Sequence, residues 1–438
     1  MKYKKTVAVT VLIGVFFYFT YPIYQFYTHK HKAPMLTPWG YESLPQNAPQ
    51  NSKVYQPHFT NTAEKALHRI GEHRAAINAP GLSIAVAIDQ ELVWAGATGW
   101  ADVATNSPMT PDTIVRIGST SKALTATGLA RMVQAQAISL DRPLRTIFTE
   151  LPNQAWADIT PRQLASHSAG MPHYKENTDY YGLLKSITLN GHYENVDDAV
   201  RLFDGSETLS APGDKFYYSS LGTVLLSAAM QSSVATTYQQ WMQEQVLTPL
   251  AMHSTLSEQR LSSSQHTQED QQVATFYWQE KGEQRRVRKW REVDLSHRLA
   301  GGGWLSTSKD LVKLGQGFID NNFIATSIKD EFWTPQILNS GKANHQNYGI
   351  GWRVHTLSLS DDEEVTYAHH GGVSRGAQSF LVVVPKYKLS LALNINSNTE
   401  EFHEFGSIAG EIIRLFIAER KTQIEENAEG ILGIARQL

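Results

Sequence analysis

Hydrophobic and polar positions follow two different periods along this chain, and the changes of period divide it into segments. Apolar Leu67, Ile70 and Ile77 recur at helical spacing and predict a helix over residues 62–78. Residues 82–88 and 91–100 alternate as half-buried strands do. The patterns from about residue 119 to residue 260 are mostly helical and are separated by polar loops.

A second group of strand patterns occupies the carboxyl-terminal half. These patterns span residues 274–278, 286–290, 352–357, 365–369, 379–384 and 389–394, and an amphipathic helix over residues 404–420 follows them. The order is therefore one helix, two strands, a long helical insertion, more strands and a final helix. This order predicts an α/β fold in which terminal helices cover one sheet and an all-α lobe is inserted.

The amino terminus has a different pattern, because residues 6–27 carry no charge. These 22 residues exceed the roughly 20 apolar residues that cross a bilayer as a helix. We expect residues 1–29 to be a signal-anchor transmembrane helix with the body on the exported, periplasmic side; a cleaved signal peptide is the alternative. Residues 30–60 are rich in Pro, Asn and Gln and are expected to form a linker. The main folded domain is then expected over residues 61–422, with a tail over 423–438.

Composition excludes several classes of function. The chain has 438 residues, of which 41% are hydrophobic and 18% charged, as in ordinary globular proteins. A formal net charge of −3 gives no reason to expect a nucleic-acid partner. Because there is no cysteine, disulfides, thiol catalysis and sulfur-ligated zinc are excluded.

The tetrapeptide Ser-Thr-Ser-Lys occurs twice, at residues 119–122 and 306–309. A serine three residues before a lysine on a helix places both side chains on one face. If that face is buried, the pKa of the lysine falls and the neutral amine can accept the proton of the serine hydroxyl.

The surrounding residues distinguish the two copies. The first copy begins an apolar, small-residue pattern typical of a buried helix, where the N–H of Ser119 is free to stabilise an oxyanion. In the second copy, Thr307 and Asp310 form a helix start that leaves Lys309 in the solvated first turn. We therefore predict that Ser119 is a nucleophile and Lys122 its proton acceptor.

Two further segments fit such a site. Tyr218 follows a turn that leads into a helix, and a nearby lysine would stabilise its phenolate for proton relay; Tyr217 is the alternative. Residues 369–372, His-His-Gly-Gly, end a strand, where the glycines admit a substrate and the Gly372 N–H is a candidate oxyanion donor. Adjacent histidines on a strand point to opposite faces, so neither a metal site nor any cofactor is predicted.

At these residues the chain resembles the serine β-lactamase and penicillin-binding-protein superfamily, in its class C β-lactamase and esterase branch. Within that branch it looks most like the mitochondrial serine β-lactamase-like proteins, which are membrane-anchored. The likeness extends over about residues 60–420 and includes the motifs at 80–83, 139–141, 159–172, 249–252 and 300–307. It implies a β-lactamase-like α/β fold, with an antiparallel sheet covered by terminal helices and an inserted all-α lobe.

The resemblance also implies roles for individual residues. Ser119 would be acylated, Lys122 and Tyr218 would transfer protons, and the N–H groups of Ser119 and Gly372 would form the oxyanion hole. His369-His370-Gly371 would replace the usual Lys-Thr-Gly, and Ser220 stands where many relatives have an asparagine that contacts substrate.

These two departures favour an esterase or peptidase over an efficient β-lactamase. With His369 in place of the lysine, anion binding there would depend on pH. The expected substrate is a small-molecule ester or a peptide, with D-amino-acid peptides among the candidates. β-Lactamase activity and a catalytically weak, binding or self-assembling protein are the alternatives. The sequence indicates no oligomeric state.

Overall fold

The computed structural model describes residues 2–28, 33, 40–189, 191–257, 272–279 and 285–435. Its largest element is an antiparallel sheet whose strands follow the order β11-β12-β13-β14-β3-β4-β2. In chain order these strands are β2 (Gln50–Val54), β3 (Gly81–Ile88), β4 (Glu91–Asp102), β11 (Arg353–Ser360), β12 (Glu363–Ser374), β13 (Ala377–Val384) and β14 (Leu389–Ile395), and the short β5 (Ser107–Pro108) pairs with β4. The antiparallel sheet expected from the sequence is confirmed.

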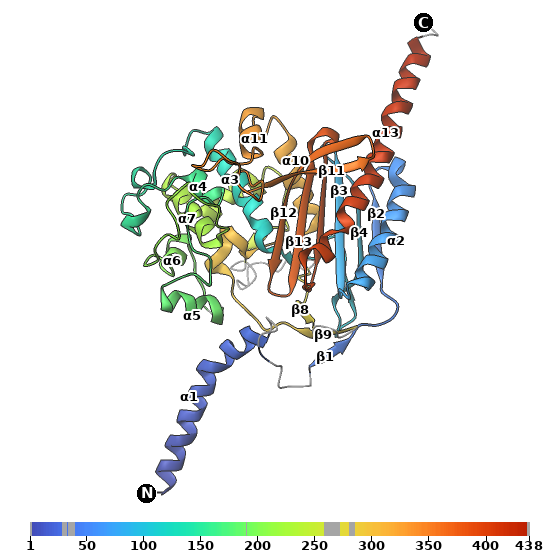
Figure 1. Cartoon of the computed structure of the whole chain (residues 1–438). Coiled ribbons are helices and arrows are strands. Elements are labelled where there is room, and N and C mark those ends of the chain that lie inside the picture. Colours follow the sequence, from blue (N-terminus) through green and yellow to red (C-terminus); the bar gives the residue numbers. More distant parts are fainter. Residues whose placement is uncertain are drawn as a thin grey trace.

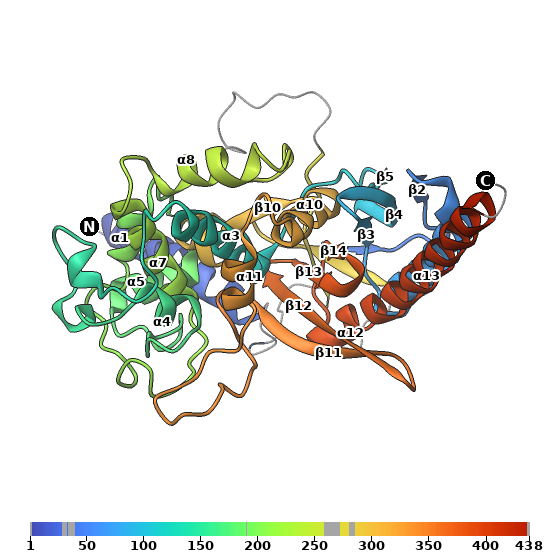
Figure 2. The same cartoon turned by 90° about the horizontal axis from the view of Figure 1, so that it is seen from above.

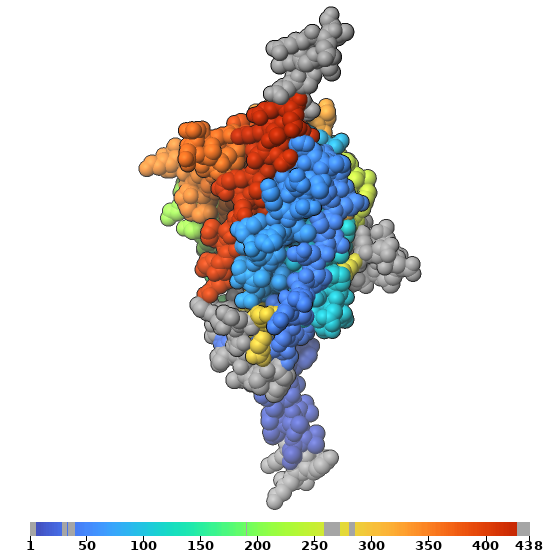
Figure 3. All heavy atoms as spheres, turned by 90° about the vertical axis from the view of Figure 1, so that its right-hand side faces the viewer, coloured from blue at the N-terminus to red at the C-terminus, as the bar shows by residue number. Residues whose placement is uncertain are grey.

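The terminal helices cover one face of this sheet (Figures 1 and 2). They are α2 (Thr60–Ala76), α12 (Phe402–Gly406) and α13 (Ile408–Ala435). Figure 3 shows α2 and α13 side by side on the outer surface. Phe416 of α13 stacks on Phe59 and on Trp94 with ring centroids 5.6 Å apart in each case, so the first and last segments of the domain share one core.

The opposite face carries the helical lobe, which lies on the left in Figure 1. Two helices pack between lobe and sheet, α3 (Ser121–Gln134) and α10 (Ser308–Ile319). The other helices of this part are α4 (Pro161–Ala165), α5 (Tyr180–Thr188), α6 (Val196–Val200), α7 (Ser220–Ser232), α8 (Tyr238–Met242) and α11 (Thr326–Phe332). Two small antiparallel sheets complete the fold: β6 (Val115–Arg116), β10 (Trp304–Ser306) and β7 (Leu256–Ser257), and β1 (Tyr41–Ser43), β9 (Arg286–Lys289) and β8 (Tyr277–Gln279).

Three expected boundaries are wrong. Residues 30–60 are not simply a linker, because β1 and β2 lie within them and β2 adds an edge strand to the main sheet. The strand expected at 274–278 begins only at Tyr277. The segment 423–438 does not begin a separate tail, because α13 continues through Glu425 to Ala435. Polar β2 escaped the pattern analysis because its residues are exposed except for the half-buried Val54.

The amino-terminal helix α1 (Lys2–Thr28) projects from the body (Figure 1). Its segment Thr6–Thr28 is long and apolar enough to cross a membrane, and its central window is not buried by the rest of the protein. The end of α1 contacts α5, and the guanidinium of Arg375 lies 5.3 Å from the ring of Phe26.

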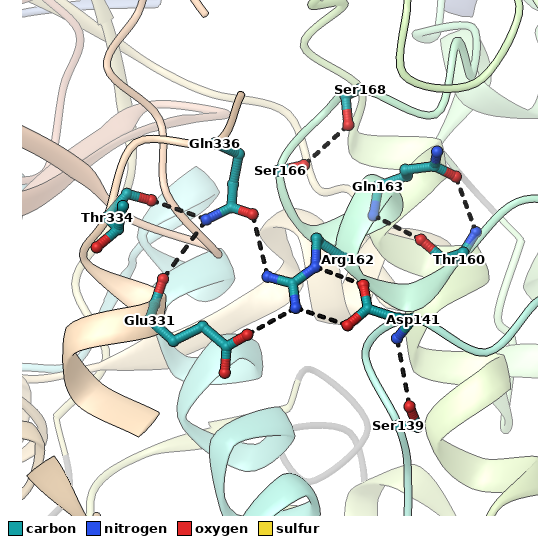
Figure 4. Close-up of polar contacts among 10 residues, drawn as sticks. All are labelled: Ser139, Asp141, Thr160, Arg162, Gln163, Ser166, Ser168, Glu331, Thr334 and Gln336. Atoms are coloured by element: carbon teal, nitrogen blue, oxygen red, sulfur yellow. Dashed lines mark hydrogen bonds and ion pairs between the residues drawn. The ribbon is translucent and has the colours of Figure 1, made fainter. Parts of the chain in front are cut away.

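A network around Arg162 connects the lobe to α11 (Figure 4). The Arg162 guanidinium donates two hydrogen bonds to Asp141, at 2.6 and 2.8 Å, and one to Glu331 at 2.6 Å. Thr160 and Gln163 form a capping box at the start of α4. The segment 159–172 is thereby held in place, and the turn that follows α4 positions part of the site described next.

Candidate active site

Ser119 and Lys122 lie in a turn that leads directly into a buried helix. Ser119 belongs to a 3-10 turn over Gly118–Thr120, and Lys122 is in the first turn of α3. Ser119 is partly accessible, whereas Lys122 is only 2% exposed. The Nζ of Lys122 lies 3.2 Å from the Oγ of Ser119, so the structure brings the two predicted residues together.

Lys122 has a defined set of partners. Its Nζ donates to the Oγ of Ser220 at 2.9 Å and to the carbonyl of Gly301 at 2.6 Å. A neutral amine has two N–H groups and one lone pair. With both N–H groups engaged in this way, the lone pair is left for the hydroxyl hydrogen of Ser119.

The surroundings favour that neutral amine. Burial lowers the pKa of Lys122 well below its usual value, and the positive charges of Arg353 and Arg298 lower it further. Within the described residues, no carboxylate is among the causes acting on this lysine. Lys122 is therefore suited to accept a proton at neutral pH.

Tyr218, and not the alternative Tyr217, completes this group. The Tyr218 hydroxyl hydrogen-bonds Ser119, and the Nζ of Lys122 lies 4.7 Å from the centroid of the Tyr218 ring. Burial raises the pKa of Tyr218 to about 12, although Ser119 and Arg353 act in the opposite direction. Burial therefore favours a neutral phenol at Tyr218 over the phenolate that the sequence analysis expected.

His167, in the turn after α4, positions the tyrosine. It has a positive φ of 60°, and its carbonyl accepts a hydrogen bond from the N–H of Tyr217 at 2.8 Å. Its Nδ1 accepts from the N–H of Ser219 at 3.3 Å, and its ring packs 4.4 Å from the ring of Tyr218. Burial lowers the pKa of His167 well below its usual value, so the ring that packs against Tyr218 is neutral.

The two histidines of β12 point to opposite faces, as the sequence predicted. His370 is fully buried on the side of the reactive group, where its Nε2 lies 2.8 Å from the hydroxyl of Tyr348. His369 faces α12 and α13, and its Nε2 lies 2.9 Å from the Nδ1 of His355. His370 therefore lies nearer to Lys122, whose charge acts on it, than does His369.

Neither histidine provides a pH-dependent anion site. Burial lowers the pKa of His369 to about 3 and that of His370 well below its usual value, with Arg353 contributing to both. Both rings are therefore uncharged near neutral pH. The expected pH-dependent attraction of an anion by His369 is wrong, because this ring is shielded from solvent and close to a guanidinium.

The pairing of β12 identifies which of its N–H groups face the cleft. The N–H of Val354 donates to the carbonyl of Asn347, which lies on the side of β11 away from β12. The N–H and C=O of the preceding residue, Arg353, therefore point toward β12, where Arg353 pairs with His369. Backbone direction alternates along the strand, so the N–H of Gly372 faces β13 and the N–H of Val373 faces the open edge. The sequence analysis named Gly372 as the donor and missed Val373.

Gly372 has a different, steric role. A Cβ at this position would lie 1.9 Å from the carbonyl oxygen of Ile117 and 2.9 Å from the N of Ser119. Gly118 has a φ of +51°, and a Cβ added there would lie 2.7 Å from the backbone of Val373. Both glycines are needed for the close approach that places the Ser119 turn against the open edge of β12.

Ser119, Tyr218 and Val373 line one cleft of about 880 Å³. Arg298, Arg353 and Arg375 border its reactive end together with Ser220 and Gly371, and no acidic side chain lines it within the described residues. Burial, with the charge of Arg298, lowers the pKa of Arg375 to about 9. The sequence analysis missed these arginines because each comes from a different loop or strand, without a local motif.

Comparisons with known proteins show which family the chain resembles over most of its length. The family model described as Beta-lactamase matches residues 68–410. The serine beta-lactamase-like protein LACTB, mitochondrial, of Homo sapiens is 27% identical over 80% of this chain and 76% of its own length. Penicillin-binding protein 4* of Bacillus subtilis is 21% identical over 72% and 67% of the two chains.

Solved structures show the same fold. The D-amino acid amidase from Ochrobactrum anthropi SV3, complexed with D-phenylalanine, superposes with a TM-score of 0.65 over 83% of this chain and 100% of that chain, at 21% identity. The octameric penicillin-binding protein homologue from Pyrococcus abyssi gives a TM-score of 0.62 over 79% and 76%, at 22% identity.

Proposed function

Because the chain belongs to the beta-lactamase family, we propose that it is a membrane-anchored serine hydrolase that cleaves esters or peptides through an acyl-enzyme. The observation that carries the proposal is the geometry of Lys122, a buried amine 3.2 Å from the Oγ of Ser119 with its N–H donors already engaged. Burying a lysine is costly, and a proton-accepting role accounts for that cost.

In the proposed acylation step, the Oγ of Ser119 bonds to the substrate carbonyl carbon while its proton passes to Lys122. The N–H groups of Ser119 and Val373 would stabilise the negative charge that develops on the carbonyl oxygen. The bond to the leaving oxygen or nitrogen then breaks. The leaving group departs as the alcohol or amine after receiving the proton by way of the Tyr218 hydroxyl.

Deacylation reverses the roles. Water bonds to the acyl carbon, its proton passes to Lys122, and the ester bond to Ser119 breaks as the Oγ recovers a proton. Free acid leaves and the starting state is restored. Ser220 would hold the Nζ of Lys122 in place through both steps, since its Oγ accepts a hydrogen bond at 2.9 Å.

The substrate is expected to be an ester or a peptide, and a D-amino-acid peptide is one candidate. A D-amino acid amidase has the same fold. The arginines at the reactive end favour a substrate with a carboxylate near the bond that is cleaved. We place the catalytic domain on the exported side of the membrane, with α1 as its anchor, because the three lysines Lys2, Lys4 and Lys5 precede the apolar segment.

Labelling with a fluorophosphonate probe tests the proposal on the full chain. The wild type and Ser306→Ala should be labelled equally, and Ser119→Ala should not be labelled, because only the first serine has a proton acceptor. Turnover of p-nitrophenyl acetate should follow the same order. Labelling that survives Ser119→Ala would contradict the assignment, and a wild type without labelling or turnover would favour a binding or self-assembling protein.

A further inference from the structure

The end of the amino-terminal helix α1 is packed against the body of the protein. Residues 6–19 are exposed along their whole length, whereas residues 22–26 are half-buried and Thr28 is only 2% exposed. This end contacts α5, beneath the helical lobe (Figures 1 and 2). The ring of Phe26 also lies 5.3 Å from the guanidinium of Arg375. The last two turns of α1 therefore belong to the contact between this helix and the rest of the protein.

The freely exposed part of α1 is too short to cross a bilayer by itself. Residues 6–19 are 14 residues, which span about 21 Å at about 1.5 Å per residue, and the hydrocarbon core of a bilayer is roughly 30 Å thick. Charged Lys2, Lys4 and Lys5 precede the apolar segment, so the missing length must come from the residues after 19. These are the residues that lie against the body. The protein surface beside them is therefore at the depth of the lipid headgroups.

The helix α5 presents an apolar, aromatic face at this place. Tyr180, Tyr181 and Leu184 are 86%, 64% and 40% exposed, and their spacing of three and four residues puts them on one side of the helix. Gly182 on the opposite side fixes this orientation, because a Cβ there would collide with the carbonyl of Leu202. The two tyrosines and the leucine are thus held facing away from the lobe.

The residue types of this face suit a lipid interface. Tyrosine combines an apolar ring with a polar hydroxyl and is enriched where hydrocarbon meets headgroups. The Nζ of Lys185 lies 5.4 Å from the centroid of the Tyr181 ring, where its ammonium can reach lipid phosphates. Tyr21 and Tyr24, whose ring centroids are 6.3 Å apart, bring the same residue type to the last turns of α1. The aromatic side chains of α1 and α5 therefore gather at one level.

From these observations we propose that α5 and the end of α1 form one membrane-contacting surface. Tyr180, Tyr181 and Leu184 lie in the headgroup region of the bilayer that α1 crosses. The inference rests on the proposed membrane anchoring and adds a second contact, which fixes the orientation of the body over the membrane. Arg375 lines the cleft and lies beside Phe26, so this orientation holds the cleft near the lipid surface.

Because the chain has no cysteine, single cysteines can probe this surface on the full chain. Tyr181→Cys and Leu184→Cys are labelled with the fluorophore NBD and reconstituted into phosphatidylcholine and phosphatidylglycerol vesicles that contain phospholipids spin-labelled near the headgroup. Both labels should lose about half of their emission, because an interfacial helix lies within about 5 to 10 Å of that depth. Ile337→Cys is the matched control and should keep its emission. Ile337 is apolar, 62% exposed and shortly after α11, which lies across the body from α1 in Figure 1.

A label at Phe16→Cys, in the exposed part of α1, separates this inference from the proposed function. Lipids spin-labelled deep in the acyl chain should quench it, and an unquenched label there would contradict the membrane anchoring itself. Quenching at Phe16→Cys, with no more at Tyr181→Cys and Leu184→Cys than at Ile337→Cys, would overturn the inference and leave the anchor intact. Labels on α5 that are shielded from aqueous iodide but not quenched by lipid would also overturn it, because a second copy or a protein partner would then cover α5. Circular dichroism of each variant should match that of the wild type.

Discussion

The two copies of Ser-Thr-Ser-Lys have the same residues and opposite environments. Lys122 is 2% exposed and donates to a hydroxyl and a carbonyl. The side chain of Lys309 is 24% exposed and forms an ion pair with Asp112 at 2.6 Å. Although partial burial lowers the pKa of Lys309, the hydrogen bond and charge of Asp112 raise it overall, so this lysine stays charged. A carboxylate partner decides which lysine can act as a base.

The serines differ in the same way. Ser119 is in a turn against the open edge of β12, with its hydroxyl in the cleft. Ser306 is the last residue of β10, fully buried, with its Oγ 2.7 Å from the Oγ1 of Thr255. In the first copy a helical turn contains both residues, whereas in the second the serine ends a strand and the lysine begins a helix. The spacing of residues alone therefore does not define the reactive pair.

Replacing each lysine in turn by methionine gives the largest expected difference in kcat/KM between the two copies. Lys122→Met should reduce kcat/KM for p-nitrophenyl acetate by about a thousandfold or more, because the serine loses its proton acceptor. Lys309→Met should leave kcat/KM within about twofold, since it removes only a partly exposed ion pair. Steady-state kinetics of both variants measures this contrast, and equal losses would show that the two copies do not differ in function.

A smaller effect is expected when the charge that acts on Lys122 is removed. Without the positive charge of Arg353, the pKa of Lys122 rises, so more of the amine is protonated at any given pH. The acidic limb of the pH–rate profile should therefore move to higher pH in Arg353→Gln, with the plateau retained within about tenfold. Arg414→Gln is the control, because Arg414 lines the same cleft and is not among the charges that act on Lys122. An unchanged limb in Arg353→Gln would mean that another group controls it.

The smallest effects concern the two threonines at the second position of each copy. Thr307 caps α10 by accepting a hydrogen bond from the N–H of Asp310, so Thr307→Ala should cost about 1 kcal/mol of stability without changing kcat/KM.

The Oγ1 of Thr120 instead donates toward the carbonyls of His370 and Ser379, at 3.3 and 3.4 Å. Thr120→Ala should lower kcat several-fold, because it loosens the Ser119 turn against β12. Urea denaturation and kinetics on both variants separate a cap from a positioning contact; a kcat loss in Thr307→Ala would contradict the separation.

Much of the sheet was predictable from the sequence because its central strands are regular and buried. The pattern at residues 82–88 corresponds to β3, which is buried at every position, and the alternation at 365–369 lies within β12. The polar edge strand β2 could not be predicted in this way, because its side chains are mostly exposed and its place depends on backbone pairing with β4.

The candidate site was predictable only in part. Ser119 and Tyr218 lie just before a helix start and Lys122 lies in the first turn of α3, a local signal that periodicity and turn residues reveal. The choice of Val373 over Gly372 depends on which residues of β12 direct their N–H groups toward the side of β11. The pairing of β12 with β11 fixes this alternation. A sequence does not specify that alternation, because shifting the pairing by one residue reverses every N–H along the strand.

The sequence by itself determined the α/β organisation, the apolar amino-terminal helix and the choice of Ser119 as the candidate nucleophile, because these depend on residue type and local spacing. Only the tertiary structure decided the protonation of Lys122 and Tyr218, the neutral state of His369 and the arginines around the cleft. The physical reason is that burial and charge at a site come from segments far apart in the chain. Solvation and electrostatic energy depend on distances in space, which no local pattern contains.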